Sequence, residues 1–177
     1  MYSGHGIMIS CDGSSHDGEW SCDQQHGYVT EKWPDGSVFK GEYQNGAKNG
    51  KRKSIWADGS YYEGDFDENN IEGFGIYNWA DGRRYERPWK DNKMHGHGTF
   101  TWLDGRKYVG DYQHDKKHGM GIHTWPSGKF YEGNWSNGYQ HGIGYLATEK
   151  NGWERKKSEW AEGKKIRWIE EGETTTK

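Results

Sequence analysis

The chain has 177 residues, of which 30% are hydrophobic, 29% charged and 16% aromatic, and its formal net charge is −3. Because this charge creates no field that attracts nucleic acid, we expect no nucleic-acid partner. No run of 18 apolar residues predicts a membrane span, no secretory signal precedes the first repeat, and two cysteines are too few for a disulfide scaffold. These features predict a cytoplasmic protein.

Aromatic side chains supply most of the apolar surface. The chain has eleven Trp, twelve Tyr and 28 Gly. Low aliphatic content with many charges usually indicates disorder, but each large ring can bury much apolar area. We therefore expect a thin sheet in which rings pack against glycines.

A two-residue signature, mostly Asp-Gly, recurs every 23 residues. It occupies positions 12–13, 35–36, 58–59, 81–82, 104–105 and 127–128, and Asn151-Gly152 follows 24 residues later. A fixed period this short is typical of a repeat array. Asp-Gly also suits a tight turn, because glycine adopts positive φ without strain.

Each repeat alternates in the manner of a β-hairpin. Tyr62, Gly64 and Phe66 alternate with polar residues, which predicts a strand with its rings on one face. A polar loop over residues 67–70 and a second alternating segment over residues 73–79 complete the hairpin. The glycine between the rings leaves space in which a ring of the next strand can lie against the backbone.

Several repeat positions together resemble the MORN repeat. The pattern is clear in Tyr131-Glu132-Gly133-Asn134-Trp135 and in His141-Gly142-Ile143-Gly144, with a further copy at 108–112 and 118–121. The resemblance covers nearly the whole chain. It implies an all-β fold, an elongated, twisted, single-layer antiparallel meander of tandem β-hairpins with no compact two-layer core.

We expect the repeat array to span residues 1–169, as about six full units with partial units at both ends. Residues 170–177 are predicted to form a disordered polar tail. Residues 4–8 are expected to form an open edge strand, and a closing hairpin is expected around residues 160–169. Arg87-Pro88 replaces the Gly-acid pair of its repeat, which predicts a local bend or weakened pairing.

The ring-bearing face predicts a non-enzymatic scaffold that binds a partner helix or extended peptide in an aromatic groove, because rings that no second layer covers usually mark interaction sites. The predicted contact rings are Tyr62, Phe66, Trp79, Tyr85, Trp102, Tyr108, Tyr112, Trp125 and Trp135. Each ring also has a packing role within the sheet. The open N-terminal edge further predicts a homodimer formed by end-to-end pairing.

A phosphoinositide-binding, membrane-binding or lipid-kinase regulatory module is the alternative. It depends on the basic cluster Lys48, Lys51, Arg52 and Lys53, which could attract an anionic lipid. A second basic group comprises Arg155, Lys156, Lys157, Lys164, Lys165 and Arg167. For both groups the other interpretation is a solvated strand face, because acids such as Glu42, Glu154 and Glu159 are interleaved with them. The resemblance implies a cytoskeletal, ciliary or membrane-peripheral location.

No catalytic, cofactor or metal site is predicted. His26, His95, His118 and His141 recur once per repeat, and successive hairpins lie roughly 9–10 Å apart, too far to share one zinc ion. The chain has no Gly-x-Ser-x-Gly elbow and no complete phosphate-binding loop. Enzymatic activity is therefore expected only if the native chain carries a further catalytic domain.

Overall fold

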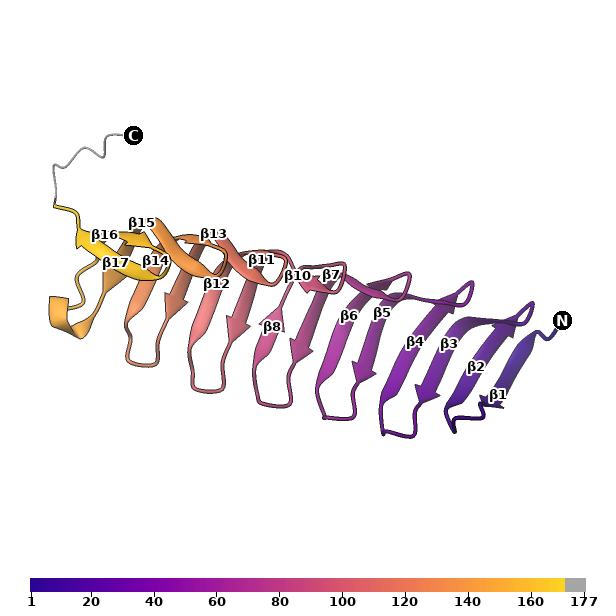
Figure 1. Cartoon of the computed structure of the whole chain (residues 1–177). Helices are drawn as coiled ribbons and strands as arrows, with labels where there is room; N and C mark the ends of the chain where they lie inside the picture. Colours follow the sequence, from indigo (N-terminus) through magenta and orange to yellow (C-terminus); the bar gives the residue numbers. More distant parts are fainter. Residues whose placement is uncertain (171–177) are drawn as a thin grey trace. The chain divides into compact units, whose positions relative to one another are not determined.

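The computed structural model describes residues 1–170, which are almost entirely β-strands joined by tight turns (Figure 1). The chain forms two compact units, residues 1–93 and residues 94–177, and each is described by itself. The predicted all-β fold is confirmed. Residues 171–177, most of the predicted polar tail, lie outside the described part.

In the first unit, consecutive strands from β1 to β7 pair antiparallel, and β7 also pairs with β8 and β9. The strands are β1 (Gly4–Ile9), β2 (Ser15–Ser21), β3 (Gln24–Lys32), β4 (Val38–Gln44), β5 (Ala47–Ile55), β6 (Tyr61–Asp67), β7 (Asn70–Asn78), β8 (Arg84–Glu86) and β9 (Trp89–Lys90). The predicted meander of hairpins is therefore present in this unit.

In the second unit, consecutive strands from β11 to β17 pair in the same way. The short β10 (Lys93–Met94) stands at the boundary, and the other elements are β11 (Gly96–Thr101), β12 (Lys107–Gln113), β13 (Lys116–Thr124), β14 (Phe130–Ser136), β15 (Tyr139–Ala147), the 3₁₀ turn η1 (Glu149–Asn151), β16 (Lys156–Ala161) and β17 (Lys164–Trp168). The predicted closing hairpin corresponds to β16 and β17.

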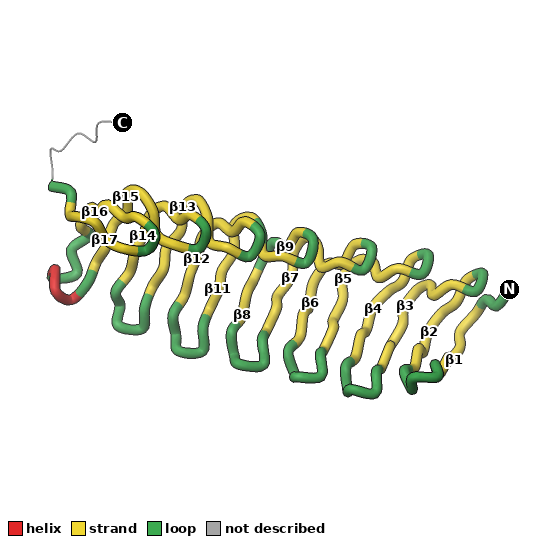
Figure 2. Tube along the Cα trace, viewed as in Figure 1, coloured by secondary structure: helices red, strands yellow, loops and turns green. Residues whose placement is uncertain are grey.

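Tight turns alternate between the two ends of the strands (Figure 2). Within a repeat, the turn has two residues in the left-handed region, as at Glu68 (φ 43°) and Asn69 (φ 70°). The predicted loop over 67–70 was therefore too long, because such a two-residue turn lets both strands run up to it. Between repeats, the predicted Asp-Gly turn is confirmed. Gly82 has φ 84°, and the Asp81 carboxylate accepts a hydrogen bond from the backbone N–H of Arg83 (3.1 Å).

A tyrosine holds the middle of each standard hairpin. Tyr131 is fully buried, and its hydroxyl donates a hydrogen bond to the backbone oxygen of Asn134 (3.0 Å). The ring lies against Gly133 and Gly144, which face each other on β14 and β15. A Cβ added at Gly144 would lie 2.5 Å from Tyr131 Oη, closer than atoms can pack. Glycine at this position is therefore a condition for burying the ring.

The same contact recurs in other repeats. Tyr62, Tyr85 and Tyr108 are also fully buried, and each hydroxyl donates to the backbone oxygen three residues later. Where the second-strand glycine is lost, the tyrosine is lost too. In one hairpin, Val29 replaces the glycine and His16 replaces the tyrosine. In the next hairpin, Arg52 replaces the glycine and Phe39 replaces the tyrosine.

The Arg87-Pro88 departure interrupts its strand, as predicted. β8 ends at Glu86, β9 begins at Trp89, and Arg87 adopts φ 82°, a conformation that favours glycine. The backbone N–H of Arg87 still donates to the oxygen of Gly75 (2.9 Å). The strand is therefore broken, while one hydrogen bond to its neighbour is kept.

The ring-to-glycine contact predicts that Gly144→Ala destabilises the protein by about 1–3 kcal/mol, because the new methyl group displaces the Tyr131 ring. Ile143→Ala, on the same strand but on the opposite face, is the matched control and should cost about 1 kcal/mol or less. Urea unfolding followed by tryptophan fluorescence measures both. Equal losses for the two variants would contradict the prediction.

Candidate functional site

In the first unit, the ring-bearing face is a packed layer. Tyr62 and Tyr85 have no exposed surface, and Phe66 is 8% exposed. The rings meet edge to face, with the centroids of Tyr62 and Phe66 5.3 Å apart and those of Tyr85 and Trp89 5.1 Å apart. Such edge-to-face contacts add to the stability gained from burial.

The second unit repeats this packing. Tyr108, Tyr112 and Trp135 are all buried, and the centroids of Tyr108 and Trp135 lie 5.2 Å apart. The indole N–H of Trp135 donates to the backbone oxygen of Gly121 (3.1 Å). Six of the nine predicted contact rings thus belong to the internal packing of their sheets, and a partner role for them stays a prediction.

The other three predicted rings, Trp79, Trp102 and Trp125, are only half-buried. Each stands directly after the second strand of its hairpin, where the ring layer ends. Each also has a basic side chain over its ring: Arg83 at 5.3 Å, Arg106 at 5.3 Å and Lys129 at 4.3 Å from the respective centroid. A partner can contact these rings without disturbing the buried tyrosines.

His123 occupies the ring layer of the second unit beside two of these tryptophans. It is 5% exposed, and its ring centroid lies 4.3 Å from that of Trp125 and 5.4 Å from that of Trp102. Burial, together with the positive charge of Lys117, lowers the pKa of His123 to about 4. His123 is therefore neutral at pH 7, so it neither repels nor neutralises the Lys117 ammonium.

Three of the four residues of the predicted lipid-binding cluster, Lys51, Arg52 and Lys53, line one hollow of the first unit, and Lys48 lies apart from them. Lys48 lies among the rings, 4.1 Å from the Phe39 centroid. Lys51 and Lys53 point to the opposite face, and Lys53 pairs with an exposed glutamate. Arg52 is buried, and this burial lowers the pKa of its guanidinium. The structure thus brings together three of the four predicted residues and leaves out Lys48.

The opposite face carries apolar side chains that sequence reasoning did not select. Tyr28 is 59% exposed, Phe74 66%, Met120 53% and Ile122 41%. Three of them, Tyr28, Phe74 and Met120, occupy the position after the left-handed glycine of the second strand. Because side chains alternate between faces along a strand, these residues point away from the rings. The recurrence of apolar residues at this repeat position was the signal that could have identified them.

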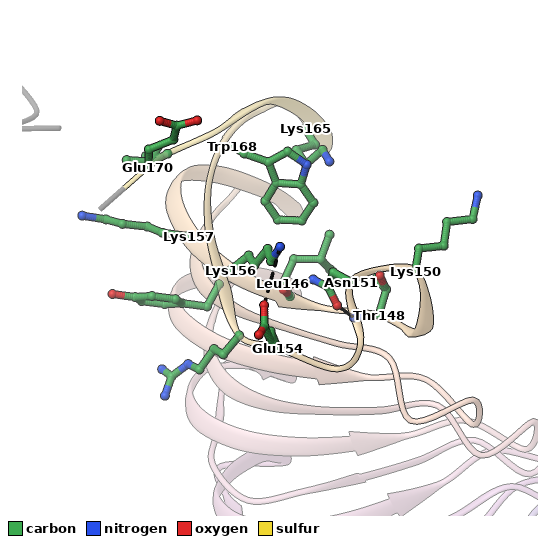
Figure 3. A pocket seen from close by; sticks show the side chains of 13 residues that line it. Leu146, Thr148, Lys150, Asn151, Glu154, Lys156, Lys157, Lys165, Trp168 and Glu170 are labelled. Atoms are coloured by element: carbon green, nitrogen blue, oxygen red, sulfur yellow. Dashed lines mark hydrogen bonds and ion pairs between the residues drawn. The ribbon is translucent and has the colours of Figure 1, made fainter. Parts of the chain in front are cut away.

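A hollow of about 1280 Å³ lies at the C-terminal end of the second unit (Figure 3). Trp168 and Leu146 contribute apolar surface, and the Lys165 ammonium lies 3.6 Å from the Trp168 centroid. Its basic lining residues are Lys150, Arg155, Lys156, Lys157 and Lys165. Arg155 and Lys156 are neutralised by Glu132 and Glu154. The remaining cations and the indole would suit an anionic group with a flat apolar part.

Within residues 1–170, no three acidic, histidine or cysteine side chains are grouped in a way that could hold a metal ion. The same part of the chain has no helix with the length and apolar character needed to cross a membrane.

This geometry defines a class of protein in which tandem β-hairpins form a sheet whose rings pack on glycines. Known MORN repeats match the chain at residues 1–15, 16–38, 39–61, 62–83, 89–105, 108–130 and 131–147. The chain therefore belongs to the MORN repeat family. The unmatched residues 84–88 contain the Arg87-Pro88 interruption. No curated protein matches the chain.

Several solved structures show low similarity. The TCP domain of Drosophila melanogaster SAS-4 (dCPAP), in complex with a proline-rich motif of Ana2 (dSTIL), is 11% identical with a TM-score of 0.45, and the match covers 94% of this chain and 90% of that chain. The wild-type TCP10 domain of Danio rerio CPAP is 13% identical with a TM-score of 0.36, covering 87% and 83%. At these values the similarities assign neither a fold nor a partner to this chain.

Burial of His123 predicts a loss of stability in acid. Its pKa is about 4 in the folded protein and 6.5 when unperturbed, so between these values the unfolded state binds more protons. The free energy of unfolding should therefore decrease as the pH falls from 6.5 towards 4. His123→Leu should reduce this decrease, because leucine does not bind a proton. The variant should fold, since the equivalent position of the next repeat already holds Leu146.

The measurement is urea unfolding at pH 7.0 and pH 4.5. Exposed His118 on the same strand supplies the control, since His118→Leu should keep the full wild-type decrease. An unchanged pH dependence in His123→Leu would show that His123 does not carry the effect.

Proposed function

We propose that the chain is a non-enzymatic scaffold that binds a helix or an extended peptide of a partner protein along its ring-bearing face. The observation that carries this proposal is the row of half-buried tryptophans at the margin of each ring layer, namely Trp33, Trp56 and Trp79 in the first unit and Trp102 and Trp125 in the second. Within residues 1–170, each unit is a single sheet, without a second layer over these rings.

Two physical arguments support this proposal. A tryptophan that is already half-buried and held by its neighbours loses little conformational freedom when a partner covers it. Trp and Tyr are also the usual anchors of protein interfaces, because they combine a large apolar area with a polar atom. The buried tyrosines supply a rigid base beneath these anchors.

The alternative of lipid binding has less support, because Lys48, Arg52 and Lys53 each lie within 4 Å of a glutamate of the chain itself. It stays a prediction, as do the homodimer and the cytoskeletal or ciliary location. The exposed apolar residues of the opposite face offer a second route to a protein partner, and the following experiment separates the two faces.

Trp102→Ala combined with Trp125→Ala should weaken partner binding by about tenfold or more, since truncating an anchor ring typically costs more than 1 kcal/mol. Affinity purification from the source cell with quantitative mass spectrometry measures which proteins are retained. Circular dichroism and thermal unfolding show whether each variant keeps its fold.

Met120→Ser combined with Ile122→Ser is the matched control, because these residues lie on β13 and face the other way. The control should retain the partners that the tryptophan variant loses. If only the control lost these partners, the binding site would lie on the opposite face. If both variants were folded and neither lost a partner, a partner site in this unit would be refuted.

A further inference from the structure

Two lysines occupy equivalent positions in the two units. Lys48 and Lys117 are three periods of 23 residues apart, and each pairs with a tyrosine of the preceding strand. Both ammonium groups lie over aromatic rings. Lys48 Nζ is 4.1 Å from the Phe39 centroid and 5.0 Å from that of Trp33. The repeat therefore builds the same ring-lined position for a cation twice.

The first of these cations has its counterion within the chain. Lys48 Nζ lies 3.3 Å from Glu31 Oε2, and the same carboxylate accepts a hydrogen bond from the Tyr43 hydroxyl (2.7 Å). His16 Nδ1 is 3.1 Å from the other carboxylate oxygen of Glu31. Glu31 thus neutralises Lys48 at the centre of a small polar network.

The second cation has rings in place of that carboxylate. Lys117 Nζ lies 4.6–4.8 Å from the centroids of Trp102, Tyr108 and Trp135. Phe100 stands where the equivalent repeat has Glu31, and it pairs with Tyr108 in the same register in which Glu31 pairs with Phe39.

The burial of Lys117 is not offset by an ion pair within the described part of the chain. Among residues 1–170 it forms no ion pair, and its polar contact is with the neutral His123, at 3.4 Å from Nδ1. Burial, together with the nearby charge of Arg106, lowers the pKa of Lys117 to about 8. Lys117 is only partly buried and keeps some exposed surface. A partly desolvated cation without a counterion favours an incoming carboxylate.

We propose that Lys117 and its three surrounding rings form a recognition site for an aspartate or glutamate side chain of the bound partner segment. The proposal rests on the proposed scaffold function and specifies the chemistry of the partner. The incoming carboxylate pairs with the Lys117 ammonium as Glu31 pairs with that of Lys48, and apolar atoms next to it contact Trp102.

The test uses random 12-residue peptides displayed on phage, fused at their C-termini so that no terminal carboxylate is available, and selected on the full chain. Selected sequences are synthesised with amidated C-termini and measured by fluorescence polarisation. The peptides should share an acidic residue, and replacing it by its amide should weaken binding by about tenfold or more.

Three variants locate the effect. Lys117→Met should keep the fold, because Met94 occupies the equivalent position one repeat earlier, and it should weaken binding by the same factor. The Lys117→Met variant should bind the peptide with the amide substitution as tightly as it binds the acidic peptide. Lys116→Gln, an exposed neighbour on the same strand, should leave the affinity unchanged. Phe100→Glu supplies an internal counterion and should also weaken binding.

Selected peptides that have no shared acid, or that bind Lys117→Met as tightly as the wild type, would overturn this inference and leave the scaffold function standing. Failure to select any peptide would overturn both. Binding that is weakened equally by Lys116→Gln and Lys117→Met would indicate general charge attraction and would also overturn the inference.

Discussion

A tyrosine ring lying against two glycines is the contact on which the standard hairpin depends. The ring can be buried only because the facing glycines have no Cβ, and its hydroxyl satisfies a backbone oxygen three residues later, as between Tyr131 and Asn134. Burial of an aromatic ring replaces the aliphatic core that this chain lacks. The two positions therefore change together, as His16 with Val29 and Phe39 with Arg52 show.

This packing decides which surfaces remain for binding. The tyrosines and their closing rings are used within the sheet, so the accessible aromatic surface of the ring-bearing face lies at its margin, on half-buried tryptophans such as Trp102 and Trp125. The lysines beside them are held in place by the same rings. Lys48 finds a carboxylate in its own chain, whereas Lys117 faces Phe100 at the equivalent position. A regular repeat thus produces one neutralised cation and one that can accept an acidic partner.

The fold could be predicted in most of its features from local patterns, and the binding surface could not. Hairpins, Asp-Gly turns, the closing hairpin and the break at Arg87-Pro88 follow from alternation, turn chemistry and proline. The same alternation placed nine rings on one face but could not separate the buried Tyr108 from the half-buried Trp125. The apolar residues Phe74 and Met120 were overlooked, because the opposite face was expected to be polar.

The sequence by itself determined the period of 23 residues, the hairpin unit and membership of a ring-and-glycine repeat class, because these depend on residues close together in the chain. Only the tertiary structure decided which rings are accessible, and which lysine has a counterion. Those properties depend on the strands of adjacent hairpins, where Glu31 reaches Lys48 across a neighbouring strand and Phe100 occupies the equivalent position near Lys117. Burial and charge pairing are set by such contacts between repeats, which the pattern within one repeat does not specify.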